Sequence, residues 1–192
     1  MEILHLLKKN GYFVQDVPES GEDLVKRIIS RRAFPETRWN SLEDIIGTGM
    51  IGEVKLENYL SFFNSLPQEA QKKVNEMWGS PRKGQRDYMF DGEKFVIPGL
   101  IFGNVFVGVQ PKRVTWQDEE NAIRLVHNSD LPVPHYWLAF YRWVTSEFNA
   151  DVIIHVGTMG PWSSRLEKEL DFPKHVFRRY QLGISLTFTF MQ

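Results

Sequence analysis

The segment from Leu131 to Gly160 constrains the fold of this chain more than any other part of the sequence. Pro132 and Pro134 prevent a regular helix before His135, because proline fixes φ and lacks a backbone N–H. Apolar residues then recur at helical spacing over residues 135–148. Residues 152–156, VIIHV, are typical of a strand that is covered on both faces. A helix followed directly by such a strand predicts an α/β fold.

A glycine turn follows this strand and suggests where a ligand would bind. Gly157 and Gly160 allow a tight turn at the carboxyl end of the strand, the usual ligand-binding side of an open α/β sheet. His155 lies just before that turn, and imidazole is a common base and metal ligand. The alternative is a core histidine that is hydrogen-bonded within the sheet. His135 follows the proline bend and would line the same cleft, or else cap its helix or lie on the surface.

The rest of the chain predicts a helical first portion and an α/β second portion. Ser20 and Ser41 are expected to cap helices, and the second of these should stop at Gly47. Asp91 and Gly92 predict a hairpin turn. The expected helices are an N-terminal one ending at residues 10–11, one after Ser20, a short one after Ser41, and those at 56–65 and 67–78; the expected strands are 12–17, 95–97 and 101–109, the last with a bulge or bend at Gly103-Asn104.

The basic loop at 79–87 is the best internal boundary. It separates a mostly helical portion, residues 1–87, from an α/β portion, residues 88–160, and residues 161–192 form a third segment. We expect residues 95–97, 101–109 and 152–156 to share one small sheet, with the helix at 135–148 covering one face. The alternating sequence LTFTF (186–190) could pair on an open edge of that sheet.

Composition excludes several classes of function. Hydrophobic residues make up 42% of the chain and charged residues 24%, which fits a globular protein. A net charge of −1 gives no reason to expect nucleic acid or an anionic membrane as a partner, and no run of residues is long and apolar enough to span a bilayer. The absence of cysteine excludes disulfides and is compatible with a cytoplasmic location. No phosphate-loop or G-x-G-x-x-G motif supports nucleotide binding.

Four segments carry a resemblance to a known family. They are PESGEDLVKRII (18–29), FVIPGLIFGNVFVGVQPKR (95–113), LVHNSDLPVPHYWLAFYRWV (125–144) and ADVIIHVGT (150–158). In this order they resemble the large subunit of ATP-dependent tetrapyrrole metal chelatases, most closely the cobaltochelatase (CobN-type) subunit and also its magnesium chelatase relative. Such subunits are very large, so the resemblance implies a slice of a larger multidomain protein.

The resemblance implies a ligase that forms nitrogen–metal bonds in cobalamin-type biosynthesis. Its substrates would be a tetrapyrrole macrocycle and cobalt or magnesium, and ATP would be hydrolysed only by AAA+-type partner subunits. His155 and His135 are then the candidate catalytic residues, and His155 is also the candidate metal ligand. The aromatic residues of the helix could stack on a tetrapyrrole, although a core role is favoured for them. The basic residues Arg82, Lys83 and Arg86 could bind the carboxylates of a corrinoid or an acidic partner subunit, or else form a solvated loop. His127 and Asp130 could mark a metal site, although loops often contain such pairs without binding a metal.

The resemblance ends abruptly after Gly160. The family continues with histidine where Met159 stands and then with a TLE-x-x-PGK segment, whereas this chain continues PWSSRLEKELDF. With permitted codons, the nucleotides for Pro161 to Asp171 read one position earlier spell TLEFAPGKGIGL. We therefore expect a frameshifted tail, and a truncated fragment of a large subunit that is inactive alone. The alternatives are a stand-alone module that binds a tetrapyrrole or metal, a non-functional gene remnant, and a purely structural interaction domain.

Overall fold

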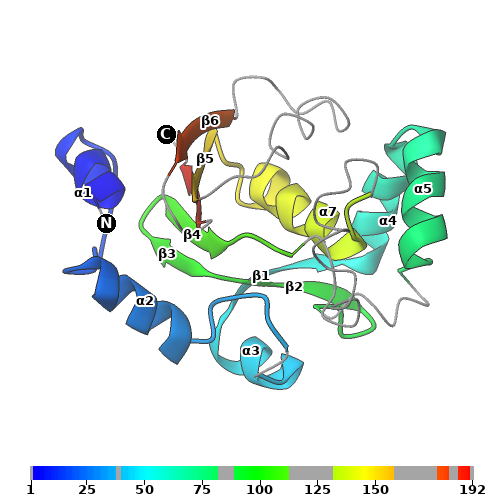
Figure 1. Cartoon of the computed structure of the whole chain (residues 1–192), viewed down its shortest axis with the longest axis horizontal. Coiled ribbons are helices and arrows are strands. Elements are labelled where there is room, and N and C mark those ends of the chain that lie inside the picture. Colours follow the sequence, from blue (N-terminus) through cyan, green and yellow to red (C-terminus); the bar gives the residue numbers. More distant parts are fainter. Residues whose placement is uncertain are drawn as a thin grey trace.

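The protein forms two β-sheets with helices packed against them (Figure 1). The computed structural model describes residues 2–37, 40–81, 89–112, 132–157, 177–181 and 186–190. A mixed α/β fold confirms the fold class that the sequence predicts. No helix in these described ranges is long and apolar enough to cross a membrane.

Three short helices form the first part of the chain: α1 (Glu2–Lys9), α2 (Gly21–Ser30) and α3 (Leu42–Thr48). Both predicted caps are confirmed, because the hydroxyl of Ser20 accepts from the Asp23 N–H and that of Ser41 from the Asp44 N–H. The predicted strand at 12–17 is wrong. Asp16 has a φ of 50°, outside the β region, and the Arg27 guanidinium donates to its carbonyl and carboxylate, which fixes a loop.

A two-stranded antiparallel sheet pairs β1 (Met50–Lys55) with β2 (Lys94–Pro98). The predicted hairpin turn before β2 is present, and the Asp91 carboxylate accepts there from the Glu93 and Lys94 N–H groups. Strand β1 belongs to residues 1–87, so the first two portions of the chain share this sheet. The expectation that residues 95–97 lie in the same sheet as 101–109 and 152–156 is therefore wrong. Helices α4 (Leu56–Ser65) and α5 (Gln68–Trp78) follow β1 and confirm the two predicted there.

The second sheet has five strands in the order β3-β4-β7-β5-β6. Its strands are β3 (Leu100–Phe102), β4 (Val105–Val109), β5 (Val152–Gly157), β6 (Phe177–Gln181) and β7 (Leu186–Phe190). Gly103, at a φ of 67°, turns the predicted long strand at 101–109 back on itself and divides it into β3 and β4. The expectation of an edge position for LTFTF is also wrong, because β7 pairs with both β4 and β5.

The helix predicted at 135–148 begins at the expected residue and changes pitch before it ends. Helix α7 (His135–Arg142) continues into the π-helix η2 (Trp143–Glu147). The indole of Trp143 packs directly on β1 at Gly52, where an added Cβ would overlap the ring. Glycine at this position therefore permits the close approach of η2 to the two-stranded sheet.

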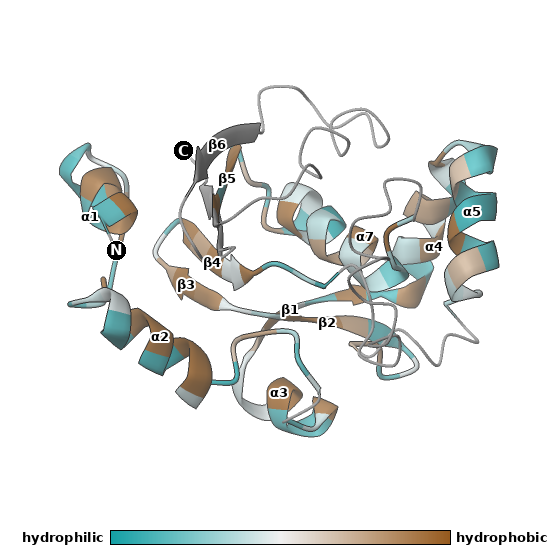
Figure 2. Cartoon of the chain, in the orientation of Figure 1, coloured by the Kyte–Doolittle hydropathy of each residue, from teal (hydrophilic) through white to brown (hydrophobic). Residues whose placement is uncertain are grey.

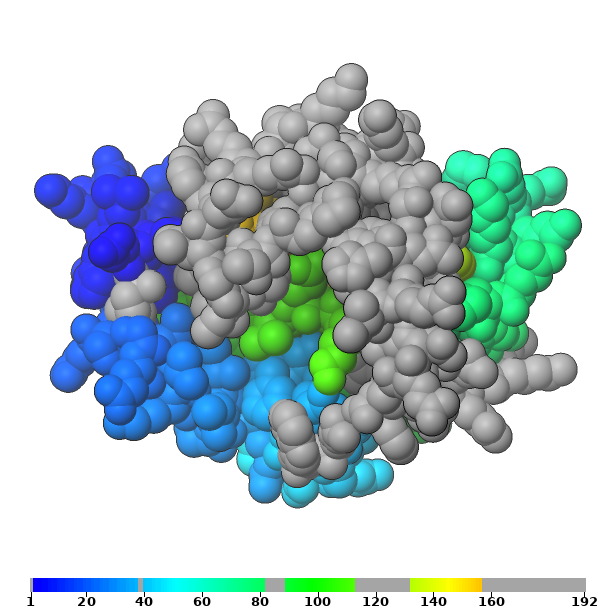
Figure 3. All heavy atoms as spheres, viewed as in Figure 1, coloured from blue at the N-terminus to red at the C-terminus, as the bar shows by residue number. Residues whose placement is uncertain are grey.

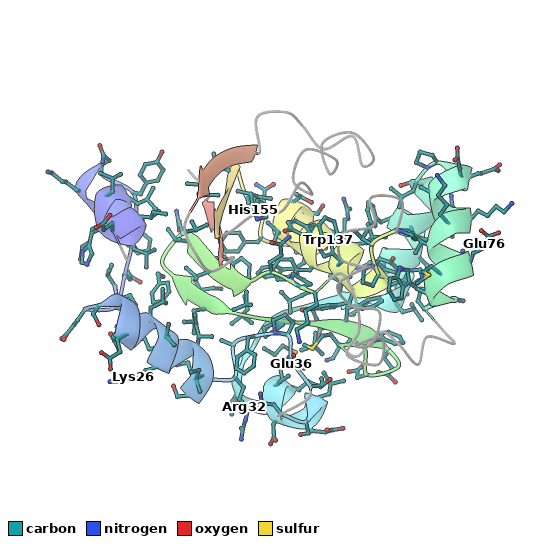
Figure 4. All side chains as sticks on the ribbon, in the orientation of Figure 1. Lys26, Arg32, Glu36, Glu76, Trp137 and His155 are labelled. Carbon is teal, nitrogen blue, oxygen red and sulfur yellow. The ribbon has the colours of Figure 1, made fainter. Side chains whose placement is uncertain are left out.

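The five-stranded sheet is covered on both faces. Side chains of α1 and α2 pack with Leu100, Phe102, Val105 and Val107 on one face. On the other face, Phe106 and Ile153 join the aromatic residues of α7 and η2. Figure 2 shows apolar residues gathered along β3 and β4, whereas the outer side of α5 is mainly hydrophilic. A buried carboxylate, that of Glu36 (Figure 4), forms an ion pair with Lys112 and so ties the loop after α2 to the segment after β4.

Candidate functional site

His155 lies on β5 and faces α7. Side chains alternate along a strand, so His155 and Ile153 share the face that the helix covers. The imidazole is 4% exposed, and its ring centroid lies 5.9 Å from that of Tyr141. Trp137, one turn earlier on α7, packs against Tyr141 with its ring tilted by 43°, at 4.1 Å between centroids. Figure 4 shows His155 and Trp137 on the same side of the sheet, one on the strand and one on the helix.

Burial keeps the imidazole of His155 neutral. Desolvation lowers the pKa of His155 to about 4, since a charged ring is disfavoured away from water. A neutral imidazole at pH 7 offers a lone pair to a metal ion. As a proton acceptor it is weak, because protonation would place a charge in this apolar setting. The surroundings therefore suit a ligand better than a general base.

The described residues do not complete a metal-binding cluster around His155. Within the ranges that the structure describes, no group of three or more His, Asp or Glu side chains could hold a metal ion. Residues 158–160 of the predicted glycine turn, including Met159, lie outside those ranges, as do Arg82, Lys83, Arg86, His127 and Asp130. A metal site with three or more such ligands would therefore need at least one of them from outside the described residues.

His135 is not brought to the same place as His155. Its Nε2–H donates to the Gly79 carbonyl at 2.8 Å, and its Nδ1 accepts from the Tyr59 hydroxyl at 2.6 Å. Both ring nitrogens are thus used inside the core, where the side chain is 0% exposed. Burial lowers the pKa of His135 to about 4, and the hydrogen bond to the Gly79 carbonyl opposes this only in part. This geometry suits a structural role, in which His135 connects α4, the end of α5 and the start of α7.

The aromatic residues of α7 and η2 belong to the core. Tyr136, Trp137, Phe140, Tyr141 and Trp143 are each at most 6% exposed. Stacking on a flat macrocycle would need an exposed ring face, so the described arrangement favours the core role over macrocycle binding. One polar group stands out among them, because the Trp137 indole N–H has no hydrogen-bond partner in the described part of the chain.

Two anchoring contacts were not predictable from local sequence. The Tyr59 hydroxyl reaches His135 from a distant helix, and the Trp78 indole N–H donates to the Pro132 carbonyl at 2.9 Å. The second contact fixes the approach to α7 from the end of α5. A tyrosine or tryptophan on an amphipathic helix carries no signal that its polar atom has a partner far along the chain.

Comparison with known proteins decides the family. Residues 1–162 match the family described as CobN/Magnesium Chelatase. The chain belongs to this family. The CobN/magnesium chelatase match covers all the elements from α1 to β5 and ends at residue 162.

Individual relatives agree with this membership. The chain is 38% identical over 161 residues to an uncharacterized protein of Methanocaldococcus jannaschii, covering 83% of this chain and 12% of that protein. It is 34% identical over 160 residues to the aerobic cobaltochelatase subunit CobN of Pseudomonas aeruginosa, again covering 83% of this chain and 12% of that protein. The catalytic subunit of cobaltochelatase from Mycobacterium tuberculosis superimposes with a TM-score of 0.61 at 28% identity, over 83% of this chain and 13% of that one. The chain therefore spans about an eighth of the length of these relatives.

Proposed function

We propose that this chain carries part of the substrate-handling region of a cobaltochelatase-type large subunit. The observation that supports this most is the family match over residues 1–162, which includes β5 and His155. In the intact protein, the substrates are a tetrapyrrole and a divalent cobalt or magnesium ion, and AAA+-type partner subunits hydrolyse ATP. The chain alone lacks the TLE-x-x-PGK segment and has Met159 in place of a histidine, so it performs no chelation by itself.

Metal insertion sets the chemical task that these residues share. Two pyrrole nitrogens lose protons while a desolvated cation enters the macrocycle, so the reaction needs metal ligands and proton acceptors. His155 is neutral at pH 7 and supplies an imidazole lone pair to the incoming cation. Tyr141 packs beside that ring from α7, and Trp137 packs in turn against Tyr141. The bases that accept the pyrrole protons belong to segments that this chain does not carry in family form.

A titration followed at the main absorbance band of a corrin or porphyrin tests this proposal. The natural chain is compared with a restored chain that carries Met159→His, the TLE-x-x-PGK segment and the downstream region. We expect weak binding by the natural chain and much tighter binding by the restored chain, and His155→Ala should weaken the restored chain. His5→Ala, at an exposed residue of α1, is the matched control. Equal binding by the restored chain and its His155→Ala variant would contradict the assigned role.

The origin of residues 161–192 is part of the same proposal. We attribute the absence of the TLE-x-x-PGK pattern after Gly160 to a frameshift, and a family match that ends at residue 162 is consistent with this origin. Sequencing of the locus tests this directly, and a verified frame without an adjacent TLE-x-x-PGK reading would contradict it. Submicromolar binding of a tetrapyrrole by the natural chain, lost in His155→Ala, would instead favour a stand-alone binding module.

We also propose a cytoplasmic location for this protein.

A further inference from the structure

Helices α1 and α2 carry more apolar residues than the protein covers. In α2, Leu24 and Ile28 face the sheet and are buried, but a second stripe of Val25 and Ile29 is 43% and 61% exposed. In α1, Leu4 is fully buried while Leu6 is 60% exposed. A helix with apolar residues on more than one face is usually covered on more than one face.

Phe13, in the loop between the two helices, is a further exposed apolar residue. Its ring is 56% exposed, although its carbonyl is held by the Asn104 N–H at 2.9 Å, so the backbone here is fixed against the β3–β4 turn. Figure 3 shows the first helix, in dark blue, next to α2, in lighter blue, at one end of the molecule. We call Leu6, Phe13, Val25 and Ile29 the N-terminal apolar face. Among the described residues, Ile101 is the one other large apolar side chain that is this exposed.

The two basic residues of α2 that follow Val25 are already paired within the chain. Lys26 pairs with Glu22 at 2.9 Å, and Arg27 pairs with Asp16 at 2.8 Å and with Asp23 at 3.1 Å. Beside α2, a partner therefore need not bring a complementary charge, and an apolar surface suffices there. Four exposed apolar side chains on two helices that share one core cluster, and on the loop that joins them, point to an interaction surface.

We infer that the N-terminal apolar face packs against the remaining part of a CobN-type large subunit. Both helices lie within the family match, so they belong to the shared fold rather than to the divergent tail. In the relatives this shared fold is embedded in polypeptides of which it makes up about 12%. The rest of such a subunit would thus pack on the N-terminal apolar face and shield it from water. This inference rests on the proposed function, since it takes the chain as a slice of that subunit.

Hydroxyl-radical footprinting of a chimera tests the inference. Residues 1–162 replace the matching segment of the Pseudomonas aeruginosa CobN subunit, and labelling is compared with that of the free full chain. Labelling of Phe13 and Ile29 should fall roughly fivefold or more in the chimera, because packing removes solvent from these side chains. Unchanged labelling of both residues overturns the inference. The readout involves no macrocycle or metal, so it stands apart from a failure of the proposed function.

Two variants distinguish the loss of an interface contact from a general loss of folding stability. The double variant Phe13→Gln/Ile29→Gln should lower the melting temperature of the chimera while leaving that of the free chain nearly unchanged. Ile101→Gln, which removes a similarly exposed side chain on β3, should leave both unchanged. An equal decrease in the melting temperature of the chimera with Ile101→Gln overturns the inference. A free-chain dimer in sedimentation that the double variant dissociates also overturns it, in favour of a second copy as the occupant.

Discussion

At the scale of single residues, the imidazole of His135 connects three elements that are far apart in the chain. Replacing its partner by Tyr59→Phe removes the hydroxyl that donates to Nδ1 and leaves a buried acceptor unsatisfied. We expect a loss of about 1–3 kcal/mol in the free energy of unfolding, measured by urea denaturation. Ser65→Ala removes an exposed hydroxyl, which donates to the Phe62 carbonyl, and should cost much less. Similar losses in the two variants would contradict the structural role of His135.

The two histidines also show what a sequence can predict about a site. The β-branched run around His155 places it on a strand, and that placement is confirmed. The distinction between a cleft residue and a core residue depends on contacts that local sequence does not encode. For His135 those contacts come from Tyr59 and Gly79, which lie on other elements, so periodicity alone could not separate the alternatives.

At the scale of elements, the close approach of η2 to β1 depends on one glycine. Gly52→Ala places a methyl group where the Trp143 ring lies, and the two-stranded sheet or the π-helix must shift. We expect a destabilisation of roughly 1–3 kcal/mol in thermal or urea unfolding, as for overpacking in a core. Gly47→Ala in α3 is the matched control, because its new methyl group meets open space, and it should stabilise the helix slightly. A neutral Gly52→Ala would show that this contact does not limit the packing.

A second prediction concerns the central strand β7. It is the strand that joins the β3–β4 hairpin to β5, so a chain ending at Gln181 leaves facing edges of β4 and β5 unpaired. Amide hydrogen exchange should become faster over residues 105–109 and 152–156 in that truncated chain. The amides that pair β1 with β2 should keep their protection and serve as the internal control. Unchanged exchange in β4 and β5 would mean that residues 186–190 contribute little to the sheet.

Element prediction succeeded where the signal was local and failed where it was not. Ser20 and Ser41 cap their helices as expected, and Asp91 turns the hairpin. The strand β1 was missed, because MIGEVK has neither strict alternation nor a β-branched run, and its pairing with β2 stabilises it. The central place of β7 was also beyond local sequence. Strand order depends on pairing between distant segments, which the alternation of LTFTF does not specify.

At the scale of the whole molecule, the two buried histidines make stability depend on pH. Burial lowers the pKa of both His135 and His155 to about 4, whereas an unfolded histidine titrates near 6.5. Between these values the unfolded chain binds more protons than the folded one. Stability is therefore complete above about pH 6.5 and decreases as the pH falls toward 4, by on the order of 3 kcal/mol per histidine at most.

Urea denaturation between pH 4.5 and 7 measures this dependence. The pKa values of Asp23 and Glu69 are lowered by hydrogen bonds from Arg27 and Lys73, so these two carboxylates protonate below this window and interfere little. In the double variant His135→Gln/His155→Gln, the free energy of unfolding should decrease less as the pH falls, even if this variant is less stable at every pH. His5→Gln, on the exposed side of α1, should retain the slope of the natural chain. A slope that persists in the double variant would place the responsible groups elsewhere, because a glutamine side chain takes up no proton in this range.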